Sequence, residues 1–224
     1  MKHCLSKSRY IRGLQCEKAL YLDTFSPEVG EFDYATRQKF LMGRQFERRF
    51  KDQFPQGIDI SKKVGRFVSK SPVLTEQFLQ QVGEIVLFEA GFMYDGVLVL
   101  ADVLRKNPDG SIDIFEVKNV EQVSSVIRND VYVQHYVIRH CVDNLHSFSV
   151  VYHDDQGFLM EELSKEALEN AAIVAQNVAR FKEVINGLEP TIEMGEQCNN
   201  PYECPYRKYC SGMGSNQLNL KFLW

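Results

Sequence analysis

The chain has 224 residues, of which 44% are hydrophobic and 25% charged, so it is long enough to bury the core of one domain. No segment approaches the roughly 20 uninterrupted apolar residues that span a bilayer, and the first residues lack the apolar region of a secretion signal. The formal net charge of -4, from 26 Lys and Arg against 30 Asp and Glu, argues against a strongly basic, nonspecific nucleic-acid coat. We therefore expect a cytoplasmic globular protein with no membrane partner, in which a local basic groove is still compatible with nucleic acid.

The first part of the chain shows mainly helical patterns. Residues 5–25 predict a short turn followed by a helix that carries Cys16. Residues 33–54 place apolar side chains at helical spacing, with Arg and Lys on the other face, and this pattern stops at Pro55. Residues 72–81, which begin with a proline, predict a further helix.

From residue 85 onward the pattern is typical of strands. Asp-Gly and Asn-Pro-Asp-Gly sequences, which favour tight turns, separate three segments rich in branched and aromatic residues: 85–94, 97–105 and 112–118. These segments predict an antiparallel meander. A helix, two strands and a long helix are predicted next, at 122–143, 147–152, 158–163 and 165–185. The fold class expected from this order is mixed α/β, with a central mixed β-sheet flanked by helices.

Acidic residues stand near the ends of two of the predicted strands. Residues two apart in a strand share a face, so Glu116 and Lys118 project together, while Val117 points into the core and leaves its carbonyl nearby. The hairpin can bring Asp102 alongside. Two carboxylates and a carbonyl oxygen suit Mg²⁺ or Mn²⁺, and a lysine can orient or help deprotonate a metal-bound water. This pattern predicts metal-dependent phosphodiester hydrolysis; the alternative is an ion pair between Glu116 and Lys118 on an exposed strand.

Asp102 followed by Glu116-Val117-Lys118, in this strand, turn, strand and helix context, resembles the PD-(D/E)XK nucleases, in particular their RecB-like branch. The resemblance implies a restriction-endonuclease-like core. It implies that Asp102, Glu116 and the Val117 carbonyl hold the metal, and that Lys118 activates or orients the attacking water.

The resemblance also implies motifs on two helices. RecB-like enzymes often carry a metal-binding histidine after Gly-x-x-apolar, and here Glu47 stands in that place, as an oxygen ligand or as a solvated helical residue. On the helix after the lysine strand, Gln134 matches the family's glutamine and would orient the substrate or the lysine. Tyr136 lies two residues later, whereas the family places its tyrosine four residues later. Glu89 is a further candidate metal ligand, or else an exposed strand residue.

Six cysteines in a reducing compartment predict metal ligands or core residues rather than disulfides. Cys198, Cys204 and Cys210 form a compact trio in a polar segment rich in Pro and Asn, which would make a poor core. A fourth ligand is needed. Four thiolates suit either an iron-sulfur cluster or a tetrahedral zinc ion, and free cysteines in a C-terminal core are the alternative.

The cysteine order resembles that of the CRISPR-associated RecB-like exonucleases and of AddB-type helicase-nuclease subunits. In these proteins one cysteine before the nuclease core and three after it hold a 4Fe-4S cluster, which implies Cys16 as the fourth ligand here. Five residues separate Cys198 from Cys204, where many relatives have two. A cluster that closes a loop of roughly 180 residues would stabilise the fold. Of the remaining cysteines, we expect Cys4 to be terminal and Cys141 to lie in the core.

The expected organisation is a helical segment at 1–60, a nuclease core at 61–190 and a cysteine-rich segment at 191–224. Basic residues from both ends would gather at a formed cluster, as a DNA track or as solvated side chains: Lys7, Arg9, Arg12, Lys18, Arg207 and Lys208. Tyrosines beside them would stack on unpaired bases or pack around the cluster: Tyr10, Tyr21, Tyr206 and Tyr209.

These expectations combine into a DNA nuclease that depends on Mg²⁺ or Mn²⁺ and carries a 4Fe-4S cluster. The substrate expected is single-stranded DNA with free ends, cut by an exonuclease in DNA repair, recombination or CRISPR spacer acquisition, with a helicase or a CRISPR integrase as partner. The absent motif histidine and the displaced tyrosine motivate the alternative, a nuclease-fold subunit that binds nucleic acid with weak catalysis.

Overall fold

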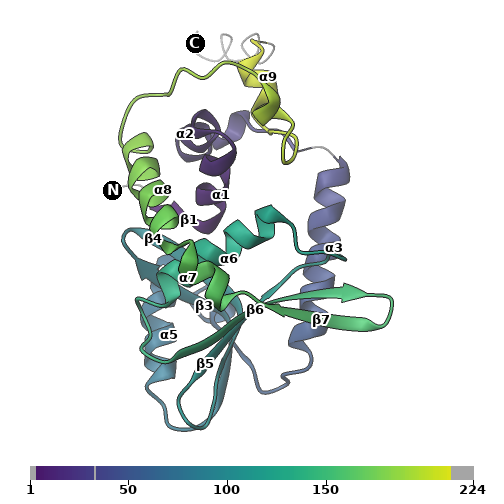
Figure 1. Ribbon diagram of the computed structural model, residues 1–224, viewed down its shortest axis with the longest axis vertical. Helices are drawn as coiled ribbons and strands as arrows, with labels where there is room; N and C mark the ends of the chain where they lie inside the picture. The colour runs from purple at the N-terminus through teal and green to yellow at the C-terminus, as the bar shows by residue number, and fades with distance from the viewer. Residues whose placement is uncertain (1–3, 33, 213–224) are drawn as a thin grey trace, which may run out of the picture.

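The computed structural model describes residues 4–32 and 34–212. In this part the chain has a mixed α/β fold, in which helices flank a central mixed sheet (Figure 1). The strands are β1 (Leu5–Ser6), β2 (Ile58–Asp59), β3 (Ile85–Tyr94), β4 (Val97–Lys106), β5 (Ile112–Val117), β6 (Leu145–Asp154) and β7 (Gly157–Glu162). Their order in the sheet is β2-β3-β4-β5-β6-β7, and β1 pairs with β4 outside this path.

Strands β3, β4 and β5 form the antiparallel meander that the turn sequences predict. Asp95 and Gly96 join the first two strands with positive φ angles of 48° and 73°, as a two-residue hairpin of the favoured hand requires. Strands β5 and β6 are parallel, and helix α6 (Ser125–Ile138) makes the crossover that such a pair needs. The expected mixed sheet is therefore confirmed.

The helices cover the sheet and extend from one end of it. They are α1 (Lys7–Gln15), α2 (Glu17–Phe25), α3 (Tyr34–Lys51), α4 (Ile60–Val64), α5 (Ser71–Leu79), α6, α7 (Ser164–Glu169), α8 (Ala171–Val184) and α9 (Arg207–Cys210), with short 3₁₀ turns η1 (Pro27–Val29), η2 (Val68–Lys70) and η3 (Glu196–Cys198).

Two of the predicted helices are interrupted. Cys16 has an extended backbone, with φ -165° and ψ 123°, and separates α1 from α2, so it lies between two helices and not inside one. The helix expected at 165–185 is divided at Asn170 into α7 and α8. Strands β1 and β2 and helix α4 were not predicted, because elements of two to five residues are too short to show a period.

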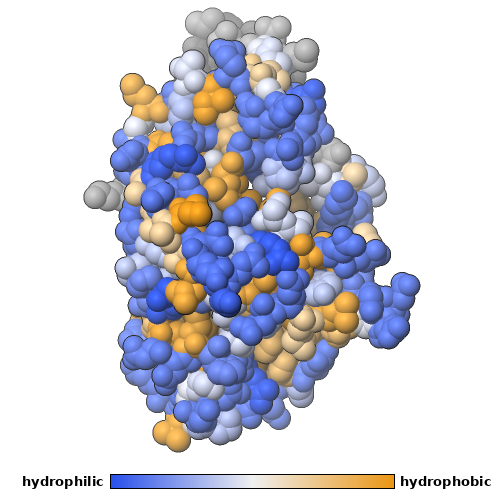
Figure 2. Space-filling model, in the orientation of Figure 1, coloured by the Kyte–Doolittle hydropathy of each residue, from blue (hydrophilic) through white to orange (hydrophobic). Residues whose placement is uncertain are grey.

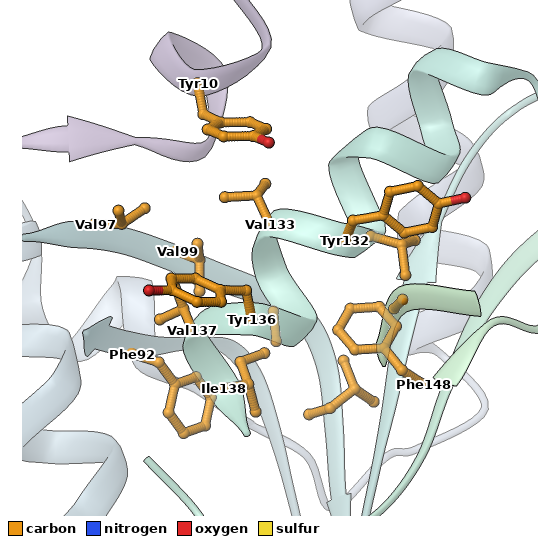
Figure 3. Packing of buried hydrophobic residues seen from close by; sticks show 14 of the residues in the cluster. Tyr10, Phe92, Val97, Val99, Tyr132, Val133, Tyr136, Val137, Ile138 and Phe148 are labelled. Atoms are coloured by element: carbon orange, nitrogen blue, oxygen red, sulfur yellow. The ribbon is translucent and has the colours of Figure 1, made fainter. Parts of the chain in front are cut away.

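The two faces of the sheet carry separate cores. The larger core lies among α1, α6, α8 and the strands, where Tyr10, Val133 and Val99 meet (Figure 3). The smaller core joins Phe46 and Phe50 of α3 to residues such as Val103 and Val151. Since neighbouring strand residues point to opposite faces, these two clusters lie on opposite sides of the sheet. Helix α3 is thereby fixed against the face opposite α6.

The terminal segments pack against this framework. Leu5, Tyr10 and Leu20 belong to the same core as the sheet, so the part of 1–60 that carries them shares a core with 61–190. Ala19 and Leu22 of α2 pack with Cys204 and Tyr206 of the cysteine-rich segment, and α9 lies at the same end of the molecule as α1 and α2 (Figure 1). The face shown in Figure 2 is mainly hydrophilic, with hydrophobic side chains in small groups. Among the described residues, no helix has the length and apolar character needed to cross a membrane.

Candidate metal centre and cysteine site

The strand register brings three carboxylates to one place in the sheet. Phe88 pairs with Val103 and Ala90 with Ala101, so Glu89 of β3 lies opposite Asp102 of β4. The β4–β5 ladder pairs Val103 with Phe115, and its next position would place Asp102 opposite Glu116. Lys118 directly follows β5. The meander therefore places Glu89, Asp102 and Glu116 side by side on neighbouring strands.

The backbone is irregular at this point. Residues three apart in a regular strand point to opposite faces, yet Leu87 and Ala90 both belong to the larger core, as do Ala101 and Leu104. Glu89 has a positive φ of 54°, which costs a non-glycine residue on the order of 1 kcal/mol or more. Both strands thus change face where the carboxylates stand, and such strain is typical of functional sites.

Glu47 of α3 completes a group of three acids. Glu47, Glu89 and Asp102 each offer a carboxylate oxygen, and these oxygens lie within 4.8 Å of one another. The Lys51 ammonium, one helical turn after Glu47, pairs with Glu47 and lies 2.7 Å from Glu89 Oε1. Oxygen ligands of this kind suit a divalent cation. The structure brings together two residues that the sequence left open, Glu47 and Glu89, with Asp102.

Glu116 is fully buried and makes hydrogen bonds through both oxygens. Its Oε1 accepts from Lys7 Nζ at 2.8 Å and lies 2.6 Å from Lys118 Nζ, while its Oε2 accepts from Gln134 Nε2 at 2.8 Å. Burial acts to raise the pKa of Glu116, but the nearby Lys118 and Lys7 outweigh burial and lower that pKa far below its ordinary value. Glu116 therefore stays ionised, and it holds two lysines in place.

Asp102 has the opposite electrostatic character. Burial and the negative charge of Glu116 raise the pKa of Asp102 to about 8, against the opposing effect of Lys7 and Lys118. Its Oδ2 accepts the backbone N–H of Val117 at 2.8 Å, and the Val117 side chain packs in the smaller core as expected. A cation beside Asp102 would favour its charged form, because opposite charge offsets both effects.

The site includes three residues that the sequence did not assign to it. Asp130 of α6 lies 2.7 Å from Lys118 Nζ and 3.7 Å from Lys7 Nζ. Lys51 is the second of these residues. Asp130 stands four residues before Gln134, and Lys51 four residues after Glu47, so each lies on the same helix face as a candidate site residue, and this spacing could have identified both. No comparable signal identified Lys7, which was expected on a DNA track and instead reaches Glu116 from 109 positions away in the sequence.

The other basic residues expected on a DNA track make contacts within the protein. Arg9 pairs with Asp23 at 3.2 Å, Lys18 pairs with Glu189 at 3.3 Å, and the Arg12 guanidinium lies over the ring of Tyr202. These contacts favour a structural role for the three side chains in this conformation.

Two of the four tyrosines expected to stack on bases or to pack around the cluster, Tyr10 and Tyr206, are buried. Tyr10 and Tyr206 are only 1% and 3% exposed, and Tyr206 donates a hydrogen bond to Asp23. Tyr136 is also buried; its hydroxyl bonds to Asp95, at the β3–β4 turn. These rings are enclosed by protein and cannot offer a free face to a base.

The four candidate cysteines come together. Cys16, Cys198, Cys204 and Cys210 line one small cavity, and Lys18 and Tyr206 also border it. All of them are free thiols. Burial raises the pKa of Cys204 and of Cys210, and the neighbouring Cys16 and Cys198 act in the same direction.

The donor set bears on the group that these residues could hold. Four thiols suit either an iron-sulfur cluster or a tetrahedral zinc ion. Of the two remaining cysteines, Cys4 is half-buried, and Cys141 is exposed beyond the end of α6, contrary to its expected place in the core.

A polar cavity of about 610 Å³ adjoins the acidic group. Glu47 and Glu89 form part of its lining, and the basic residues around it come mainly from α3. They are Arg44, Arg48, Lys51 and Lys62. Negative ligands for a cation and positive partners for phosphates thus border one space.

No family model and no curated protein matches this chain. Among solved structures, the crystal structure of SSO0001 is similar, with a TM-score of 0.50, 12% identity, and coverage of 95% of this chain and 87% of that chain. At this identity the similarity concerns the fold alone. It extends the mixed α/β architecture over nearly the whole chain and leaves the chemistry to the residues described above.

Proposed function

We propose that this protein is a metal-dependent DNA nuclease with a PD-(D/E)XK-type site and a four-cysteine 4Fe-4S site. One observation carries the proposal: Glu47, Glu89 and Asp102 converge from three elements, next to the strand whose Glu116 contacts Lys118. Convergence of acids and a lysine on one irregular part of a sheet is what metal-assisted hydrolysis needs.

The charges of the site match one divalent cation. Five carboxylates, those of the four acids and Asp130, face three ammonium groups, those of Lys7, Lys51 and Lys118. Five negative and three positive charges leave a formal charge of -2 when all are ionised. We infer that Mg²⁺ or Mn²⁺ would be held by Glu47, Glu89 and Asp102, with Glu116 and the Val117 carbonyl beside it.

Within this proposal, the protein residues have separate tasks. When bound, the ion would lower the pKa of the attacking water and stabilise the negative charge on the phosphate. Lys118 orients that water, while Glu116 and Asp130 fix the lysine from two sides. Gln134 fixes Glu116 through its second oxygen. Arg44, Arg48 and Lys62 line the adjoining cavity and would bind the phosphates of a DNA strand.

The cysteine site fits a cluster by its donor set. Four soft thiols gather from both ends of the described chain around one small cavity. Cys16, Cys198, Cys204 and Cys210 would hold the cluster, which would join the two ends and stabilise the fold.

Cleavage of labelled single- and double-stranded DNA by anaerobically purified protein tests the nuclease proposal. With Mn²⁺, wild type should cut, and Lys118→Met should lose cutting, whereas a change in the exposed turn, Asp109→Asn, should not. A brown protein with broad visible absorption supports the cluster. Full activity of Lys118→Met would refute the assigned site.

A second candidate is a DNA-binding subunit with weak catalysis. It is favoured by Lys51, whose ammonium contacts both Glu47 and Glu89 and competes with a cation for the same oxygens. DNA binding that persists without cleavage, in Mg²⁺ and in Mn²⁺, would favour this function over the nuclease.

A further inference from the structure

Lys7 occupies a place in the carboxylate site that its sequence position does not suggest. Its Nζ donates to Glu116 Oε1 at 2.8 Å and lies 3.7 Å from Asp130 Oδ2. Its side chain is 21% exposed, which is low for a lysine. Lys118 contacts the same two carboxylates, at 2.6 and 2.7 Å. Two lysines and two carboxylates thus form one closed network.

The backbone before and after Lys7 is firmly held. Leu5 is fully buried and pairs with Val97 in the parallel β1–β4 ladder. Ser6 caps α1, since its side chain accepts the N–H of Arg9 at 3.3 Å. Lys7 is the first residue of α1, so the strand and the helix together fix the direction in which it enters the site.

We propose that Lys7 is a positioning residue of the catalytic site: it holds Glu116 and Asp130 in the arrangement that aims Lys118 at the reacting water. This inference rests on the proposed nuclease function. Without Lys7, Lys118 would be the sole ammonium between two buried carboxylates, and it would be drawn toward them. The ammonium of Lys7 balances this attraction.

The geometry argues against a phosphate-binding role for Lys7. A lysine on a DNA track presents its ammonium to solvent, whereas Lys7 directs its Nζ to a fully buried carboxylate, that of Glu116. Loss of Lys7 should therefore reduce turnover and leave the affinity for DNA unchanged. It should also strengthen Mn²⁺ binding, because one positive charge beside the cation is removed.

Helix α1 links Lys7 to the cysteine site. At its other end, Gln15 Nε2 donates to the carbonyls of Gln197 at 2.9 Å and Tyr202 at 2.7 Å, and Cys16 follows directly. Between the ends, Gly13 lies against Phe181 of α8 so closely that a Cβ would come within 2.9 Å of the ring. Nine residues of helix span about 13.5 Å. One rigid element therefore carries the positioning lysine and adjoins a proposed cluster ligand.

The test compares Lys7→Met, Lys7→Arg and a control, Lys182→Met, as full-length anaerobic protein. Lys182 pairs with Asp95 at the β3–β4 turn, so the control removes a lysine ion pair outside the site. We expect Lys7→Met to lower kcat about 100-fold with KM for DNA unchanged. By electron paramagnetic resonance, its Mn²⁺ affinity should rise about tenfold. Lys7→Arg should restore part of kcat, and Lys182→Met should match wild type.

The outcomes separate this inference from the proposed function. Wild-type kcat in Lys7→Met, or a loss confined to KM, would overturn the positioning role. If wild type itself cuts no DNA, the nuclease proposal fails, and the Mn²⁺ titration still decides whether Lys7 belongs to the site. Unchanged Mn²⁺ affinity in Lys7→Met would then overturn the inference. Equal melting temperatures of the variants would exclude misfolding, and Lys7→Arg provides the comparison if Lys7→Met unfolds.

Discussion

The carboxylate site and the cysteine site are built on different kinds of support. Asp102 and Glu116 stand on long strands of the central sheet, between the two hydrophobic cores. The cysteines stand at the break between α1 and α2, in a 3₁₀ turn, in a loop and in the four-residue helix α9. The apolar cluster around them is small, with Ala19 and Leu22 as its main aliphatic members.

The two sites also differ in how their polar groups are balanced. Each carboxylate of the acidic site has a lysine, an amide or a backbone N–H beside it, so the chain itself compensates most of the charge. The cations Lys18 and Arg207 border the cysteine thiols, but both are paired with glutamates, Glu189 and Glu203. We therefore propose that removal of bound metal would disturb the cysteine site more than the acidic site.

The largest expected effect is on stability, at the cysteines. Cys198→Ser should abolish visible absorption and lower the melting temperature strongly, because binding of a structural metal group contributes about 10 kcal/mol or more to folding in small metal sites. Cys141→Ser, at an exposed cysteine, should change neither quantity. If Cys198→Ser kept both the colour and the melting temperature of wild type, the cysteine site would not be a cluster site.

The next effect is at the acidic site, where catalysis should fall and stability should rise. Asp102→Asn should reduce Mn²⁺-dependent cleavage by about 10³-fold, roughly 4 kcal/mol. Its stability without metal should rise at neutral pH, because Asp102 has a folded pKa of about 8, above its ordinary value, and its charge destabilises the fold once the pH exceeds that ordinary value. Urea unfolding in chelator at pH 7.5 measures the gain. Lower stability of Asp102→Asn would contradict the electrostatic account.

The sequence predicted the parts of the fold and site that depend on local patterns. Strand alternation and turn sequences located β3, β4 and β5, and the distance of 2.6 Å between Lys118 Nζ and Glu116 Oε1 agrees with the expectation that these side chains project together. The fourth cysteine came from a resemblance, and the structure does place Cys16 beside the trio. The chemistry of both sites stays a prediction.

The remaining features depend on contacts between distant segments. The position of Lys7 follows from β1, a two-residue strand that has no detectable period. Glu89 turns toward Asp102 through a positive φ that nothing in its residue type suggests. Tyr136 resembled a motif residue, but it points to a different face of α6 from Gln134 and packs against Tyr94 and His140. Tertiary packing decided these three positions.

Helix α6, which supports the acidic site, carries a buried histidine that makes the free energy of unfolding depend on pH. Burial, with Arg139 and His140 nearby, lowers the pKa of His135 to about 4. Between pH 6.5 and 4 the unfolded chain therefore takes up a proton that the folded chain does not, and the free energy of unfolding falls by up to about 1.4 kcal/mol per pH unit. Above pH 6.5 His135 is neutral in both states, so it no longer makes the free energy of unfolding depend on pH.

His135→Phe should remove that slope, because it replaces the ring with one of similar size that cannot be protonated. Urea unfolding of both proteins at pH 7 and pH 5 gives the difference. Asp102 contributes with the opposite sign in this range, but equally in both proteins, so the comparison isolates the histidine. Equal slopes would show that the pKa of His135 is the same in the folded and the unfolded protein.

The smallest expected effect lies at the connection between the two regions. Gln15→Ala removes the two hydrogen bonds from α1 to the carbonyls of Gln197 and Tyr202, and should cost about 1–3 kcal/mol of stability. All four cysteines and Lys7 stay present, so colour should persist. If α1 transmits the position of the cysteine segment to Lys7, kcat should also fall, by more than in the exposed control Gln53→Ala. Hydrogen exchange of α1 locates the cause: faster exchange with a lower kcat means that the sites are coupled, and faster exchange with wild-type kcat means that β1 alone holds Lys7.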